Sequence, residues 1–126
     1  MGDSDSVRAW AGILGVAGVT LGAFGAHALK ETLISRNVMD SWKTAVQYQL
    51  LHALALLSVS TREVDRKSTV NWGRVTSLWV AGTILFSGSI YGLCLGGPRI
   101  LGPVTPVGGL LLIGGWACLL FGSEGK

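Results

Sequence analysis

The sequence predicts an all-α integral membrane protein with four transmembrane helices in an antiparallel bundle. Hydrophobic residues make up 49% of the 126 residues and charged residues only 13%, against the roughly 25% charge of soluble domains. The mean hydropathy is +0.52. Too few charges are present to give four soluble helices polar outer faces. We therefore expect one domain, residues 1–126, with its apolar surface in contact with the lipid bilayer.

The first expected span covers residues 9–29 and carries no formal charge when His27 is neutral. At 1.5 Å per residue it is long enough to cross about 30 Å of hydrocarbon. The run is longer than the core of a signal peptide, so we expect it to be retained. Residues 30–43 carry five charged side chains and are expected at the interface or in water: Lys30, Glu31, Arg36, Asp40 and Lys43.

The second expected span, residues 44–60, has the weakest signal because Gln47, Gln49 and His52 interrupt it. It can cross a membrane only as a helix whose polar stripe faces other parts of the protein. A polar loop, residues 61–74, follows and contains six charged side chains: Arg62, Glu63, Asp65, Arg66, Lys67 and Arg74.

The third expected span is residues 75–95, whose serines and threonines can bond to carbonyls of their own helix. Glycine and proline in the turn at 96–103 end it. The fourth span, residues 104–121, has Pro106 near its start, where the missing amide proton costs little. A bilayer offers no partner for exposed backbone groups, so all four spans must be helical.

With four crossings, both termini and the central loop lie on one side of the membrane. That side carries six basic residues and the other side four. The excess favours both termini on the cytoplasmic or equivalent side.

Glycines recur at helical spacing within the spans, 19 in the whole chain. Gly18 and Gly22 share a face of the first helix, Gly88 and Gly92 a face of the third, and Gly108 and Gly115 are seven residues apart in the fourth. Rows of small residues let membrane helices approach closely. We interpret these glycines as helix-packing positions.

Polar residues within or beside the spans are the candidate functional residues: His27, Glu31, Gln47, Gln49 and His52. Polar groups in hydrocarbon usually face a partner or a water-filled cavity. They favour either a network of hydrogen bonds between helices or a path that carries protons. Two histidines alone make an incomplete metal site, so no metal is expected.

Other residues have simpler interpretations. Trp10, Trp42, Trp72 and Trp79 lie near expected span ends and are interpreted as interfacial anchors, whereas Trp116 is deeper. Cys94 and Cys118 lie in apolar runs and predict no disulfide. The basic residues form no stripe, so we expect no nucleic-acid partner. No phosphate loop, serine elbow or carboxylate pair is present, so no catalytic or cofactor-binding residue is predicted and we expect no enzyme.

Four segments carry a family resemblance: LGAFGAHALK (21–30), WKTAVQYQLLHALAL (42–56), LFSGSIYGL (85–93) and GPVTPVGGLLLIGGW (102–116). In this order they closely resemble the domain of unknown function 423 family of small membrane proteins. The resemblance implies a multi-pass membrane protein and assigns no catalytic role. Because the family includes bacterial and animal proteins, it implies a bacterial inner membrane or an organelle of bacterial descent, such as the mitochondrion.

The leading hypothesis is a noncatalytic protein that packs into a membrane assembly or a homo-oligomer through its glycine rows. The rival hypothesis is a small transporter or proton-conducting channel whose path is lined by His27, Glu31, Gln49 and His52. A membrane enzyme would need a cofactor or subunit that the sequence does not disclose.

Overall fold

The computed structural model describes residues 4–62 and 68–123, and the described residues form helices without any strand. The all-α prediction is therefore confirmed. The helices are α1 (Ser4–Ala26), α2 (Lys30–Ser35), α3 (Met39–Ser60), α4 (Trp72–Cys94) and α5 (Leu101–Phe121). Four of them are 21 to 23 residues long, and α2 has only 6 residues.

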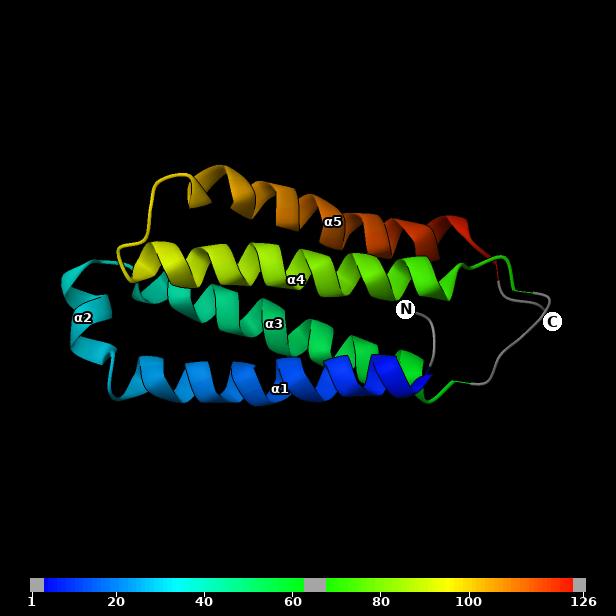
Figure 1. Ribbon diagram of the computed structural model, residues 1–126, viewed down its shortest axis with the longest axis horizontal. Helices are drawn as coiled ribbons and strands as arrows, with labels where there is room; N and C mark the ends of the chain where they lie inside the picture. Colours follow the sequence, from blue (N-terminus) through cyan, green and yellow to red (C-terminus); the bar gives the residue numbers. More distant parts are fainter. Residues whose placement is uncertain (1–3, 63–67, 124–126) are drawn as a thin grey trace.

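The four long helices lie side by side in a row, with neighbours antiparallel (Figure 1). α1 packs chiefly on α3, α3 on α4, and α4 on α5. The short helix α2 connects α1 to α3 and covers one end of the row. As a result α3 and α4 are central, whereas α1 and α5 form the two edges.

Three helices are long and apolar enough to cross a membrane, namely α1, α4 and α5. α3 is 22 residues long and is not among them, since it carries Asp40, Lys43 and the polar residues at 47, 49 and 52. The structure thus supports a membrane protein with three candidate spans, and a fourth crossing by α3 stays a prediction.

The helix boundaries differ from the expected ones at several ends. α1 runs from Ser4 and ends at Ala26, before the expected limit at 29. Residues 30–35 form α2, a helix that the sequence analysis did not anticipate. α5 begins at Leu101 because Pro103 is accommodated in its first turn, where no amide proton is needed. Of the expected loop 61–74, the end is helical from Trp72, and residues 63–67 lie outside the described part.

Three local features set the ends of the helices. The Asn71 side chain accepts a 3.0 Å hydrogen bond from the Arg74 amide, which caps the start of α4. After α4 the chain turns at Gly96, whose φ of +87° lies in the left-handed region that glycine adopts without strain. Asn37, with φ of 58°, makes the corresponding turn between α2 and α3.

Two tryptophans occupy the protein interior. Trp42 is 1% exposed and Trp79 is 2% exposed. Trp42 packs with Leu33 and Cys94 at the α2 end, and Trp79 belongs to the larger apolar cluster nearer the other end. The prediction that these two side chains are interfacial anchors is therefore wrong, because an indole enclosed by protein cannot lie among lipid headgroups.

Candidate functional site

Buried polar side chains concentrate on the two central helices. They are Gln49 and His52 on α3 and Thr76, Thr83, Ser87 and Ser89 on α4. A polar group enclosed by apolar neighbours is stable only when it is hydrogen-bonded. The partners of these groups therefore define what the site can do.

Gln49 joins three helices. Its amide nitrogen donates a 2.9 Å hydrogen bond to the Leu14 carbonyl on α1. Its amide oxygen accepts a 2.7 Å bond from the Tyr91 hydroxyl on α4. The side chain is 4% exposed, so both bonds are shielded from solvent. One residue of α3 thereby fixes the helix on either side of it.

His52 links α3 to α5 through both ring nitrogens. Nδ1 lies 2.8 Å from the Tyr48 carbonyl, which can only accept, so Nδ1 carries the proton. Nε2 accepts a 3.0 Å bond from the Trp116 indole N–H. This pattern fits the neutral imidazole, because a second proton on Nε2 would face an indole that is only a donor.

An aromatic cluster surrounds His52. Its ring meets those of Trp79 and Trp116 edge-on, with centroids 6.1 Å and 5.9 Å away. The two indoles are themselves 4.6 Å apart. These geometries are the edge-to-face and tilted contacts that aromatic rings prefer. The cluster packs the imidazole between α4 and α5 and leaves it 3% exposed.

Further hydrogen bonds connect neighbouring helices along the row. The Trp42 indole donates to the Leu21 carbonyl at 2.9 Å, and Ser87 donates to the Ala45 carbonyl at 2.7 Å. The hydroxyls of Ser89 and Thr105 are 2.5 Å apart and join α4 to α5. Each neighbouring pair of long helices is thus held by at least one polar contact.

The remaining predicted polar residues lie elsewhere. His27, Glu31 and Gln47 are exposed, and the first two lie in or beside the turn that leads into α2. α3 begins at Met39, at the same end of the molecule as this turn. His52 lies thirteen residues further along α3, or about 20 Å away along the helix axis. The structure therefore does not bring His27 and Glu31 together with Gln49 and His52.

Most of the predicted packing glycines contact a neighbouring helix or the loop beside it. A Cβ on Gly18 would lie 2.7 Å from Leu50, and one on Gly22 would lie 3.3 Å from Val46. Gly108 abuts the backbone of Phe86 and Gly115 abuts the Trp79 indole. A Cβ on Gly92 would meet the Leu101 side chain at 2.6 Å.

Gly88 differs, because no described atom lies within 4 Å of a Cβ placed there, so its packing role stays a prediction. Gly25 and Gly82 make close contacts that the sequence analysis missed. Gly25 abuts the Trp42 indole, and a Cβ on Gly82 would lie 2.8 Å from Leu112. Both glycines fall outside the spacings singled out in the sequence, so only the tertiary contacts reveal them.

The geometry of potential metal ligands and the hydrogen bonding of buried polar atoms bear on what the described residues can do. Among the described residues, no group of three or more His, Cys, Asp or Glu side chains converges as metal ligands would. Within the same part of the chain, the buried polar atoms left without a partner are the indole nitrogens of Trp72 and Trp79 and the Thr83 hydroxyl. No local sequence pattern identifies Trp116 as the hydrogen-bond donor to His52, because the two residues are 64 positions apart in the chain.

Comparisons with known proteins identify relatives that are named membrane proteins. The chain is 43% identical over 115 residues to a UPF0382 membrane protein of Schizosaccharomyces pombe, which covers 87% of this chain and 94% of that protein. It is 43% identical over 105 residues to a UPF0382 membrane protein of Staphylococcus haemolyticus, covering 83% of this chain and 84% of the relative. The UPF0382 inner membrane protein YgdD of Escherichia coli is 41% identical over 116 residues, covering 90% and 86%.

No solved structure matches the chain significantly. Residues 21–109 match the family model described as a protein of unknown function, DUF423. This match contains the exposed turn at α2, the Gln49 and His52 positions and the close contact at Gly108. On the family match and the three relatives together, the chain belongs to the DUF423 family of membrane proteins, for which no activity is established.

Proposed function

We propose that α3 is a fourth transmembrane helix, so that the chain crosses the membrane four times. Support comes from the distribution of its side chains. Gln49 and His52 face protein, and the large exposed side chains in the second half of α3 are apolar: Leu51 is 54%, Leu54 66% and Leu57 44% exposed. In its second half, α3 thus has Gln49 and His52 at the protein side and large apolar side chains outside, which suits a helix between protein and lipid.

On this basis the chain is a noncatalytic component of a membrane assembly or a homo-oligomer. The observation that carries the proposal is that Gln49 and His52 have their hydrogen-bonding groups committed to neighbouring helices. A side chain in that state stabilises a packing arrangement rather than a substrate. The apolar outer faces of α1 and α5 remain available to lipid and to partner helices.

Gentle solubilisation from native membranes, followed by native gel electrophoresis and mass spectrometry, tests this role. We expect the chain to migrate with partner proteins or as a discrete homo-oligomer. A stable monomer that recovers no partner would contradict the assembly role.

The transporter hypothesis makes a different prediction, which reconstituted liposomes can test. Proton conduction needs a continuous path, and about 15 Å of α3 lies between its first residue, at the α2 end, and Gln49, the nearest buried residue of the proposed path. We therefore expect liposomes with the wild-type chain to be as proton-tight as liposomes with His52→Ala. A proton leak present only with the wild type would contradict the noncatalytic role.

The membrane itself is also a proposal. The Escherichia coli relative is named an inner membrane protein. We assign the chain to a membrane of that kind or to an organelle of bacterial descent, such as the mitochondrion, with both termini on the cytoplasmic or equivalent side. Fractionation with membrane markers should place it there, and recovery in another membrane would overturn the assignment.

A further inference from the structure

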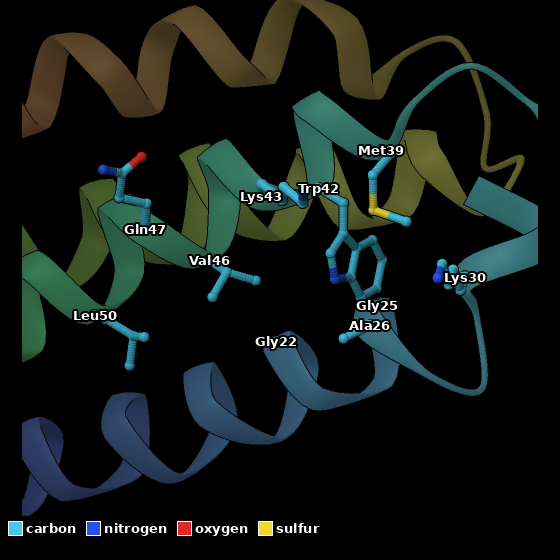
Figure 2. A pocket seen from close by; sticks show the side chains of 10 residues that line it. All are labelled: Gly22, Gly25, Ala26, Lys30, Met39, Trp42, Lys43, Val46, Gln47 and Leu50. Atoms are coloured by element: carbon cyan, nitrogen blue, oxygen red, sulfur yellow. The ribbon is translucent and has the colours of Figure 1, made fainter. Parts of the chain in front are cut away.

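A partly enclosed groove of about 630 Å³ lies between α1 and α3 near α2 (Figure 2). Its walls are apolar. The α1 wall consists of Gly22, Gly25 and Ala26, and the α3 wall includes Trp42, Val46 and Leu50. The groove exists because small side chains on α1 face larger ones on α3 and leave the space between them unfilled.

Two lysines line the same groove. Lys30 begins α2 and Lys43 lies in the second turn of α3, and both are exposed. Neither forms an ion pair with a carboxylate of the described residues. Gln47 also lines the groove, and the Trp42 indole N–H donates a hydrogen bond to the Leu21 carbonyl. The groove therefore combines apolar walls with two positive charges that have no counterion within the described chain.

The acidic residues near this groove do not line it and do not neutralise its two lysines. Asp40 lines a separate groove of about 590 Å³ on another side of α3, together with Thr44 and Cys94. Glu31 is exposed on α2 and contributes to neither lining. These two grooves beside α3 thus differ in charge, with lysines along one and a carboxylate along the other.

The position of the charges matches the layers of a bilayer. Lys43 is four residues after the first residue of α3, or about 6 Å along the helix. From Lys43 to Leu50 the groove extends about 10 Å further from that end. Long lysine side chains reach toward the headgroups while their stems remain on apolar surface. An occupant with an anionic head and an apolar tail fits this gradient.

We propose that this groove binds one anionic phospholipid, with its phosphate between Lys30 and Lys43 and an acyl chain along Gly22, Val46 and Leu50. Each lysine close to a membrane surface contributes about 1 kcal/mol to the attraction of anionic headgroups. A zwitterionic lipid brings a cationic group of its own and gains less from the two lysines. The inference goes beyond the assembly role and rests on the proposal that α3 lies in the membrane.

The test is a titration of the purified full chain in uncharged detergent with phosphatidylglycerol or phosphatidylcholine, read out by native mass spectrometry. We expect one phosphatidylglycerol to bind about twentyfold more tightly than phosphatidylcholine. Lys30→Gln and Lys43→Gln should each lower that preference about fivefold. Arg99→Gln is the matched control, because it removes one exposed charge at the same end of the molecule outside the groove, and it should change the preference less than twofold.

Two further measurements separate headgroup from tail. Ala26→Leu keeps both lysines and places a larger side chain on the α1 wall, which narrows the groove. It should therefore weaken phosphatidylglycerol binding without a change in thermal stability. Inorganic phosphate at the same concentration should not displace the lipid. Equal affinities for the two lipids, equal effects of the lysine and Arg99 variants, or displacement by phosphate alone would each overturn the proposal. Failure here leaves the assembly role intact, since that role is judged by co-migrating proteins.

Discussion

The central and edge helices differ in how much of their surface is buried in the protein and in which side chains face their neighbours. Of the residues in the apolar stretch of each helix, 22% are buried in α1 and 17% in α5, compared with 39% in α4. The edge helices are apolar on nearly all sides, whereas α3 places glutamine and histidine against its neighbours. Hydropathy therefore identifies helices that face lipid and underestimates a helix whose polar groups are satisfied by protein.

The largest effect should come from the closest contact between a central and an edge helix. In Gly108→Ala, the new Cβ would overlap the backbone of Phe86, which cannot rotate away. We expect a loss of about 3 kcal/mol in the free energy of unfolding. Thermal unfolding in mild detergent measures it.

Gly109→Ala is the matched control, because its Cβ would lie 3.6 Å from the Phe86 ring, an ordinary contact. The extra alanine also favours helix, so this variant should be as stable as the wild type or more stable. A similar loss in the two variants would show that α4 and α5 do not meet at Gly108.

The second effect concerns the polar centre. Gln49→Met keeps the length of the side chain and removes the bonds to Leu14 and Tyr91. We expect a loss of about 2 kcal/mol, from two interhelical bonds of about 0.6 kcal/mol each and an unpaired tyrosine hydroxyl that costs about 1 kcal/mol. Gln47→Met, at an exposed position two residues earlier, should be neutral in the same unfolding assay. Equal losses would refute the inward role of Gln49.

A smaller effect is expected at the link between α3 and α5. Trp116→Phe keeps an aromatic ring and removes the donor to His52. One such bond contributes about 0.6 kcal/mol in a membrane protein. A double-mutant cycle with His52→Leu isolates the pair, and its coupling energy should match that value. Strictly additive losses would mean that the two rings do not interact.

The smallest effect belongs to the outer surface. Leu110 on α5 is 67% exposed, so Leu110→Ala should change the stability in detergent by less than about 0.5 kcal/mol. Leu112→Ala, at a position that is 4% exposed, should cost about 2 kcal/mol. A large loss at 110 would indicate that this face is covered by a second copy in solution, and dilution of the sample would then lower the stability.

The sequence predicts the apolar edge helices α1 and α5, but it does not predict the short helix that connects α1 to α3. Lipid-facing runs leave a long signal in hydropathy, so the spans ending near Ala26 and Phe121 could be placed within a few residues. The six-residue helix α2 is too short to produce a periodic signal. The charges that begin at Lys30 therefore predict only a polar segment at the membrane interface or in water.

The candidate site was predicted in part for the same physical reason. Gln49 and His52 stood out because polar groups are rare in apolar runs, but their partners Leu14 and Trp116 are 35 and 64 positions away in the chain. Such contacts depend on how helices pack and leave no local pattern. Trp42 was misplaced because nearness to a span end does not distinguish an indole that faces headgroups from one that faces another helix.

The most direct test of the account is the side of the membrane on which each end lies. In a chain with Cys94→Ala and Cys118→Ala, Ser4→Cys, Ser35→Cys and Ser123→Cys are introduced singly and labelled in sealed vesicles with an impermeant maleimide. With α3 as a fourth span, cysteines at 4 and 123 are labelled from the same side and the cysteine at 35 from the opposite side. Labelling of 4 and 123 from opposite sides would show that α3 does not cross, and would contradict the account.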